Sequence, residues 1–249
     1  MWFESARVEA VRDAFPEWLA FLVAFLSHLG SVWFVAPAVV LAFWYLDPRR
    51  FASWIGIVLG CYAVMIGLKG FFETPRPGVD PAVPVESLPV LVAVVYAPAV
   101  EISTSSFPSG HAMAAVVVWT MLAIRNRTRA RGRRAATTAV FATSVALASL
   151  ALVTDGRADT AALLGGSIGG LLAWRYATPP REPLNRTPRG VLPAALGSGL
   201  LAGIAATLLV VDSHFVWLIV GLIGGTVVVG LPAFAARRPS AATFRGSTS

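Results

Sequence analysis

The chain has 249 residues, of which 56% are apolar and only 13% charged, and its mean hydropathy is +0.71. A soluble globular domain carries about a quarter charged residues, so this composition excludes an ordinary soluble protein. The net charge of +7 does not indicate nucleic-acid binding, because the arginines lie in short loops between apolar blocks. Cys61 is the single cysteine, so we expect no intrachain disulfide and no cysteine-rich metal site.

The apolar residues fall in blocks of about 15–22 residues, the length that a helix needs to cross a hydrocarbon core of roughly 30 Å. We therefore expect an all-α fold, a polytopic helical membrane bundle of about six or seven transmembrane spans. The predicted spans are residues 31–46, 53–72, 108–124, 135–154, 160–174, 191–211 and 215–235.

The N-terminal region mixes acidic and basic residues and lacks the basic start of a secretory signal, so no cleaved peptide is expected. Residues 17–29 are apolar but few, and Gly30 ends them. They are interpreted as an interfacial or half-inserted helix, with a longer, tilted first span as the competing interpretation. The expected division is an N-terminal interfacial segment (1–30), a membrane domain (31–236) and a disordered cytoplasmic tail (237–249).

Basic residues lie on one side of the predicted spans. Most of the 20 fall in the segments 47–52, 125–134 and 175–190 or after Arg237. The positive-inside rule places these segments in the cytoplasm. The arginines of 125–134 are interpreted first as a topology anchor and second as a contact for anionic lipids.

The long connection 78–106 then lies on the outer side of the membrane. Its four prolines argue against a regular helix, and its valine-rich stretch 90–95 could lie on the membrane surface. Connections of this length are uncommon unless they are functional or disordered. We interpret it as a lid or substrate-facing segment, with a plain spacer as the alternative.

Two polar motifs end or begin apolar blocks on that same outer side. Lys69, the only lysine, lies seven residues before Arg76-Pro77, and Pro108-Ser109-Gly110-His111 opens the next predicted span. A cation at the edge of a bilayer is costly, so it is a candidate functional residue. Lys69 can serve as a point charge, while Arg76 can fork across two oxygens of a phosphate.

The second motif adds groups that suit an anion. A proline favours a helix start, and the N–H groups at such a start attract anions. Gly110 lets the backbone approach a ligand closely, and Ser109 can donate its hydroxyl. His111 could protonate a leaving oxygen, because the pKa of histidine lies near working pH.

These two motifs resemble the first two signature blocks of the type 2 phosphatidic acid phosphatase (PAP2) family, whose fold also occurs in vanadium haloperoxidases. The resemblance covers about residues 30–174, so the PAP2-like core would be 31–177, followed by two extra spans in 191–236. It implies that Lys69, Arg76, Ser109 and Gly110 bind phosphate. It also implies that His111 is the acid and that no metal or other cofactor is needed.

The third family block, Arg-x5-His-x3-Asp, is changed here. Its best register is Ser149-x5-Asp155-x3-Asp159, so the carboxylate is matched by Asp159, whereas Asp155 stands where the family has its nucleophilic histidine. Three interpretations stay open. Asp155 could itself be the nucleophile, although its charge would weaken phosphate binding. His28 or His214, the latter beside Asp212, could replace the missing imidazole. Otherwise turnover is lost and an anion site is retained.

The expected function is a PAP2-type membrane protein that hydrolyses or binds a lipid phosphate or isoprenoid pyrophosphate at the outer face. The alternative is an inactive homologue that binds phosphorylated lipid. A small transporter ranks last, because the predicted spans hold almost no polar residue at mid-membrane depth. Expected partners are membrane lipids and the phosphorylated lipid, without nucleic acid. The sequence leaves the oligomeric state open.

Other conspicuous residues have structural interpretations. We expect Arg157 to cap the outer turn or to pair with Asp155 or Asp159. The tryptophans are interpreted as interface anchors and packing residues. Paired glycines in 165–170 and 221–225 are expected to allow close contacts between helices.

Overall fold

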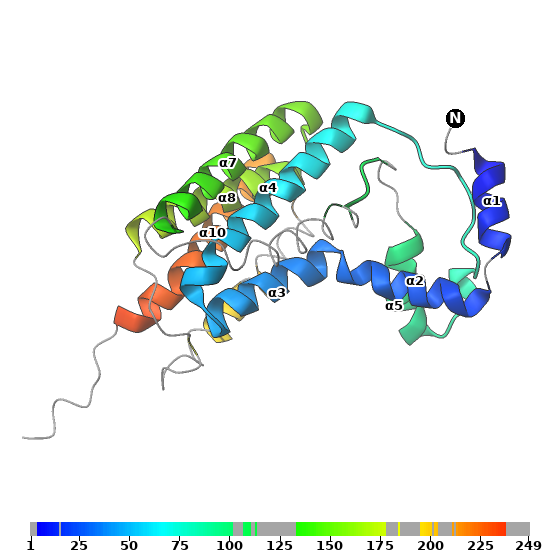
Figure 1. Ribbon diagram of the computed structural model, residues 1–249, viewed down its shortest axis with the longest axis horizontal. Coiled ribbons are helices and arrows are strands. Elements are labelled where there is room, and N and C mark those ends of the chain that lie inside the picture. The colour runs from blue at the N-terminus through cyan, green and yellow to red at the C-terminus, as the bar shows by residue number, and fades with distance from the viewer. Residues whose placement is uncertain are drawn as a thin grey trace, which may run out of the picture.

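A computed structural model describes residues 4–14, 16–101, 107–110, 113, 133–177, 184, 195–200, 202–203, 211 and 213–237. The helices in chain order are α1 (Ser5–Ala14), α2 (Glu17–Leu29), α3 (Val32–Tyr45), α4 (Pro48–Phe72), the short 3-10 helix η1 (Val85–Ser87), α5 (Val90–Val100), α7 (Arg133–Asp155), α8 (Ala158–Tyr176) and α10 (His214–Arg237). None of the described residues forms a strand, so the all-α prediction is confirmed (Figure 1).

Three of the described helices are long and apolar enough to cross a membrane: Pro48–Phe72, Arg134–Asp155 and His214–Ala236. A fourth span results if α2 and α3, which meet at a bend of 44°, count as one. The segment 17–29 therefore fits both predicted interpretations, a half-inserted helix and the first part of a longer span. The predicted spans 108–124 and 191–211 lie mostly outside the described residues, so the count of six or seven spans stays a prediction.

Helix α4 is capped at both ends, and its caps fix where Lys69 stands. The carboxylate of Asp47 accepts hydrogen bonds from the backbone N–H groups of Arg49 and Arg50, and Pro48 occupies the first turn. At the other end Glu73 adopts a left-handed conformation (φ 43°) and closes the helix onto the carbonyl of Lys69. Lys69 therefore lies in the last turn, just before the chain leaves the helix.

Helices α4 and α7 run side by side in the same direction. They approach each other closely because small residues line one face of α4. A Cβ added to Gly56 would meet Val140 at 2.9 Å, and one added to Gly70 would meet Asp155 at 3.0 Å. Between these contacts, Ser144 donates hydrogen bonds to the carbonyls of Gly56 and Val140. Small residues of this kind allow the backbones of membrane helices to approach each other.

Helices α8 and α10 also run in the same direction and pack backbone against backbone. A Cβ on Gly165 would overlap the carbonyl of Leu218, and one on Gly225 would overlap the carbonyl of Gly166. The predicted role of these glycines in close helix contact is confirmed. Because α7 and α8 form a hairpin, the beginnings of α8 and α10 and the ends of α4 and α7 lie at one end of the bundle.

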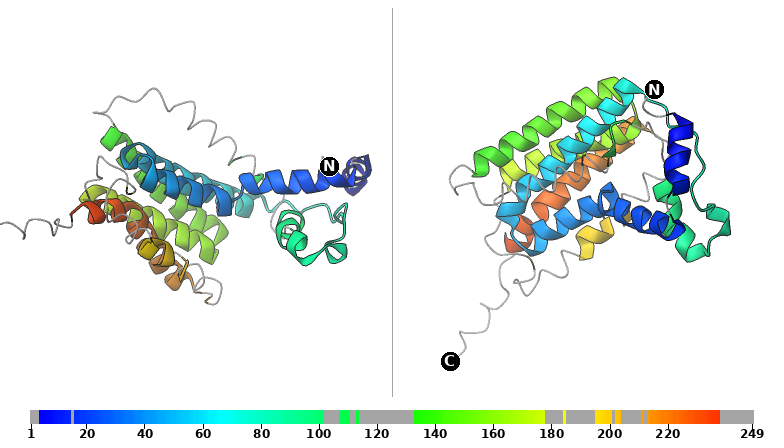
Figure 2. Two further views of the ribbon diagram at one scale, coloured as in Figure 1. Left: turned by 90° about the horizontal axis from the view of Figure 1, so that it is seen from below. Right: turned by 45° about the vertical axis from the view of Figure 1, so that its right-hand side comes forward.

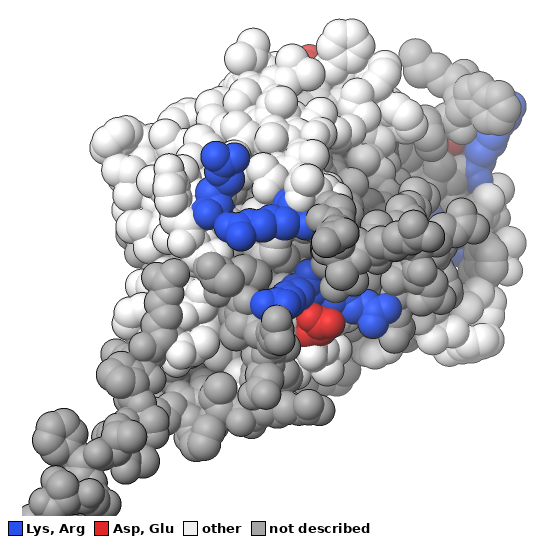
Figure 3. All heavy atoms as spheres, turned by 60° about the vertical axis from the view of Figure 1, so that its left-hand side comes forward, with Lys and Arg blue, Asp and Glu red and all other residues white. Residues whose placement is uncertain are grey.

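The opposite end of the bundle is basic (Figure 3). Arg49 and Arg50 begin α4, Arg134 lies in the first turn of α7, and Arg175 lies in the last turn of α8. The guanidinium of Arg134 donates to the carbonyl of Arg175 at 3.3 Å. These four arginines, which come from three of the predicted basic segments, thus lie at one end of the bundle.

The tryptophans that the structure describes are divided between packing and exposure. Trp44 is buried, and its indole nitrogen donates to the carbonyl of Val228 at 2.9 Å, which ties α3 to α10. Trp174 is also buried, whereas Trp18 is exposed on α2. Packing therefore accounts for Trp44 and Trp174.

Helices α1, α2 and α5 form a lobe beside the bundle (Figures 1 and 2). A small cluster of Ala24, Val83 and Tyr96 joins α2 to α5 within it. The prediction that prolines exclude a regular helix from the segment 78–106 was wrong for α5. Pro89 precedes the first turn, and Pro98 lies two residues before the last helical residue, so the helix loses a single hydrogen bond, to the carbonyl of Val94.

Candidate functional site

Three cations gather at the end of the bundle opposite the basic loops. Lys69 lies in the last turn of α4, and Arg76 follows four residues after the end of that helix. Arg157 lies in the turn between α7 and α8. Arg76 and Arg157 are both close enough for their charges to act on Lys69. Lys69, Arg76 and Arg157 thus lie at the same end of the bundle, and their joint binding of a phosphate stays a prediction.

The second motif begins its helix beside the same end of α4. The rings of Phe107 and Phe72 are in edge contact, with centroids 5.3 Å apart. A Cβ on Gly110 would lie 2.6 Å from the sulfur of Met65. Met65 is four residues before Lys69, so both side chains lie on the same face of α4. The Ser109-Gly110 backbone therefore packs about one helical turn from Lys69.

The side chains of the second motif are described in part. Ser109 and Gly110 are described, and the carbonyl of Ser109 accepts from the N–H of Met113 at 3.1 Å, which begins the helix. His111, the predicted acid, lies outside the described residues. Its role stays a prediction.

Asp155 is packed against α4 and is almost inaccessible. It ends α7, its side chain is only 9% exposed, and a Cβ on Gly70 would lie 3.0 Å from its Cα, Cβ and Oδ1 atoms. Its Oδ2 atom is buried and has no hydrogen-bond partner among the described residues. The carboxylate thus lies beside the residue that follows Lys69, in the place where the family block has an imidazole.

Arg157 joins the two carboxylates of the altered third block. Its guanidinium lies 2.6 Å from Asp159 Oδ2 and 3.6 Å from Asp155 Oδ2. The predicted pairing of Arg157 with these residues is confirmed. The sequence did not predict that Arg157 would also approach Lys69. The one feature of the sequence that pointed to Arg157 was its position between two acidic residues in a predicted outer turn.

The two histidines considered as replacements lie in different places. His28 Nε2 bonds to the carbonyl of Val95 on α5, in the lobe beside the bundle. His214 Nε2 bonds to the carbonyl of Gly156, the residue that follows Asp155. Because a carbonyl only accepts, the Nε2 atom of His214 donates, and Nδ1 is the ring nitrogen left for other contacts. Of these two histidines, His214 is the one that contacts the turn containing Arg157.

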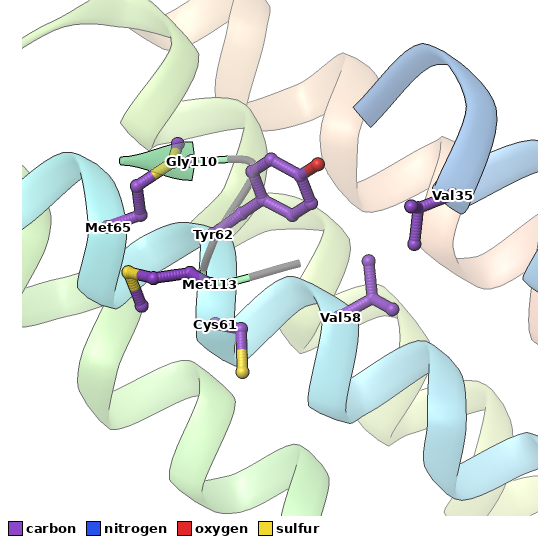
Figure 4. A pocket seen from close by; sticks show the side chains of 7 residues that line it. All are labelled: Val35, Val58, Cys61, Tyr62, Met65, Gly110 and Met113. Atoms are coloured by element: carbon purple, nitrogen blue, oxygen red, sulfur yellow. The ribbon is translucent and has the colours of Figure 1, made fainter. Parts of the chain in front are cut away.

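A small apolar pocket lies below this group of residues, toward the middle of the bundle (Figure 4). Val35 of α3 faces Val58 and Tyr62 of α4 across it, and Met65, Gly110 and Met113 line its other side. Its cavity volume is about 10 Å³, close to the minimum for a single water. The pocket is therefore a small space between α3, α4 and the helix start at Gly110.

No three His, Cys, Asp or Glu side chains in the described part of the chain are grouped so that they could hold a metal ion. The cations at this end of the bundle and the helix start at Gly110 suit an anion, because positive charges and helix-start N–H groups favour negative charge.

Comparison with known proteins gives one match. A family model described as the PAP2 superfamily matches residues 50–182, which contain both polar motifs and the altered third block. No curated protein and no solved structure matches the chain significantly.

Proposed function

Because the chain belongs to the PAP2 superfamily, we propose that it is a membrane phosphatase-like protein that holds the phosphate group of a lipid at the outer end of its helix bundle. The observation that carries this proposal is the approach of Arg76 and Arg157 to Lys69, next to the helix start at Gly110. Cations at a membrane edge are costly, so three of them together favour an anionic ligand.

Each group has a distinct task in binding phosphate. Lys69 offers a compact charge, and Arg76 offers a planar fork that matches two phosphate oxygens. Ser109 and the N–H groups near Gly110 add hydrogen bonds at the start of a helix. Catalysis of phosphoryl transfer depends mainly on positioning of this kind and on positive charge around the phosphate.

The charge distribution supports an orientation in the membrane. The arginines at the other end of the bundle favour the cytoplasm, which leaves Lys69 on the extracytoplasmic side of a multi-pass cell-membrane protein. A ligand that reaches this site from the membrane plane is a lipid with a phosphate or pyrophosphate head, such as phosphatidic acid or an isoprenoid pyrophosphate.

Whether the bound phosphate is hydrolysed depends on the nucleophile. Asp155 suits this role poorly, because it is nearly buried, faces Arg157 and adds negative charge beside the phosphate. It balances the charge of Arg157 instead, together with Asp159, the relic of the family's orienting carboxylate.

A second candidate function, turnover, is favoured by His214. Its bond to Gly156 brings an imidazole from α10, outside the matched region, to the turn of Arg157. In this scheme Nδ1 attacks phosphorus and the bond to the leaving oxygen breaks, while His111 donates a proton to that oxygen. Water then hydrolyses the phosphohistidine.

Phosphate release from phosphatidic acid and from an isoprenoid pyrophosphate tests these alternatives in purified protein. The variants are His111→Ala, Asp155→His and His214→Ala, and His28→Ala is the matched control because His28 makes the same kind of hydrogen bond in another part of the molecule. If the protein binds the lipid phosphate without hydrolysing it, the wild type releases no phosphate and the Asp155→His variant gains phosphate release.

If His214 is the nucleophile, the wild type releases phosphate. The substitutions His111→Ala and His214→Ala then each lower the rate by about 100-fold or more, while His28→Ala leaves it unchanged. Absence of both release and lipid-phosphate binding in every variant would contradict the proposed function.

A further inference from the structure

We propose that α5 lies in the plane of the membrane, in the leaflet at the Lys69 end of the bundle, and contacts the lipid hydrocarbon with its exposed face. This contact is independent of the phosphate site, because it needs no ligand at Lys69. Every residue of α5 (Val90–Val100) is apolar, apart from the hydroxyl of Tyr96. A helix that is apolar on every side is normally buried on every side, in protein or in a membrane.

Protein covers one side of α5. Tyr96 is only 2% exposed and packs against Ala24 of α2, and its ring lies 5.2 Å from that of Phe21, centroid to centroid. His28 adds a hydrogen bond to the carbonyl of Val95. Helix α2 thus holds α5 in place beside the bundle, as Figures 1 and 2 show.

The opposite side of α5 is exposed and apolar. Val90, Leu91 and Val94 are 77%, 84% and 67% exposed, and Pro98 is exposed as well. Positions three and four apart lie on one face of a helix, so these side chains form a continuous stripe. A contiguous exposed apolar patch marks an interaction surface.

The length and the ends of α5 indicate how it meets the membrane. Eleven residues make a helix of roughly 16 Å, too short for a hydrocarbon core of about 30 Å and typical of an interfacial segment. Glu86 precedes α5, Glu101 follows it, and both are exposed. Burying either carboxylate in hydrocarbon is costly. Both ends therefore lie at the level of the headgroups, with the helix axis in the membrane plane.

The exposed face of α2 is apolar too, which makes lipid a better occupant than water for this lobe. It consists of Trp18, Leu22, Phe25, Leu26 and Leu29. Helix α1, by contrast, has no buried residue and carries four charges in ten residues. Trp18 lies near the junction of the polar and apolar helices, where an indole suits the membrane boundary.

The connection to the bundle indicates the leaflet. The hydroxyl of Tyr62, in the second half of α4, donates to the carbonyl of Gly30 at 3.5 Å. From Gly30, α3 runs toward the basic end, where α4 begins. Helix α2 meets α3 at a bend of only 44°, so it continues away from the basic end. The lobe therefore belongs to the half of the bundle that carries Lys69.

This contact has a consequence for the connection between the two polar motifs. In the chain, α5 lies between Arg76 and Ser109. A helix held in the leaflet by lipid on one side and by α2 on the other would keep this connection at the membrane surface.

Nitroxide labels on single cysteines in a Cys61→Ser background test the proposal. The labelled variants are Leu91→Cys and Val94→Cys, and Val11→Cys on α1 is the matched control, because Val11 is also a valine and is 58% exposed. The full-length protein is placed in vesicles of phosphatidylcholine and phosphatidylglycerol. Power saturation then measures collisions of each label with oxygen, which concentrates in hydrocarbon, and with a water-soluble nickel chelate.

The ratio of oxygen to nickel collisions at positions 91 and 94 should exceed that at position 11 by about tenfold or more, because hydrocarbon excludes the polar chelate. Nickel collisions at position 94 as frequent as at position 11 would place this face in water. Few collisions with either reagent would mean that protein, such as a second copy of the chain, covers it. Each of these two results would overturn the proposal.

A charge on the stripe provides a second measurement. Leu91→Glu, combined with the label at Val94→Cys, should lower the ratio at position 94 toward that at position 11, because a carboxylate draws this face out of the hydrocarbon. Ala10→Glu on α1 is the control and should leave the ratio at position 94 unchanged, because Ala10 is exposed on the polar helix. The same ratio with and without Leu91→Glu would contradict a lipid contact at this face.

Discussion

At the scale of single residues, Gly70 decides how the end of α7 meets the end of α4. It follows Lys69, and its missing side chain leaves room for Asp155 within contact distance of the α4 backbone. This contact also sets the position of the turn that begins with Gly156. Arg157 can then pair with both carboxylates and still act on Lys69.

We predict that Gly70→Val separates these ends. Its branched side chain must displace the backbone of Asp155, and overpacking of this kind costs about 1–3 kcal/mol. The melting temperature in detergent should fall, and the affinity for phosphatidic acid should fall with it. Gly78→Val is the control, because a Cβ at Gly78 meets no atom within 4 Å. Equal stability of the two variants would contradict this account of Gly70.

The sequence allowed part of the site to be predicted. The spacing of Lys69 and Arg76, and the turn at Ser109-Gly110, predict a phosphate site, and the structure places Phe107 and Gly110 against Phe72 and Met65 of α4. The approach of Arg157 to Lys69 could not be predicted, because it depends on the register between α4 and α7. That register is set by small residues whose partners the sequence does not name.

At the scale of helices, the close packing of α8 on α10 positions His214. The two helices begin at the same end, and contacts between their backbones continue from Gly221 on Ala162 to Gly169 on Leu222. This packing carries the start of α10 to the turn after α7. The place of His214 beside Gly156 is thus a consequence of glycine spacing.

We predict that Gly165→Ala forces α8 and α10 apart. Its Cβ would overlap the backbone of Leu218, which cannot rotate away as a side chain does, so the cost should be about 2 kcal/mol or more. Thermal unfolding in detergent measures this loss. Gly199→Ala has open space around it and should leave the melting temperature within about one degree of the wild type. An unchanged melting temperature in Gly165→Ala would contradict the packing.

The lengths of the apolar blocks predicted the long helices of the bundle well and the helices of the lobe beside it poorly. The five predicted spans that the structure describes are helices close to their expected bounds. Helix α5 was missed because its prolines were given more weight than their positions deserved. A proline before the first turn or in the last turn leaves the middle of a helix intact.

At the scale of the whole molecule, the separation of charge gives a testable orientation. Cys61 is the single cysteine, so a Cys61→Ser background allows single-cysteine labelling. Gly78→Cys should react with a membrane-impermeant maleimide in intact cells, whereas Ala177→Cys should react only after permeabilisation. The reverse pattern would place Lys69 on the cytoplasmic side and contradict the proposed orientation.

Two ends of one bundle thus have different tasks. In the proposed function, the arginines at one end orient the protein and the cations at the other end bind the ligand. Arg175 and Lys69 both lie in the last turn of their helices, α8 and α4, but at opposite ends of the bundle. Removing either charge changes the net charge by the same amount, so a difference between the two variants reports on location alone.

The affinity of the purified protein for dioleoyl phosphatidic acid, compared in the wild type, Lys69→Gln and Arg175→Gln, tests the central claim most directly. Lys69→Gln should weaken binding by about tenfold or more, the value of a charge-assisted hydrogen bond, and Arg175→Gln should not change it. Equal affinities in all three proteins would contradict the claim that the cations around Lys69 form the phosphate site.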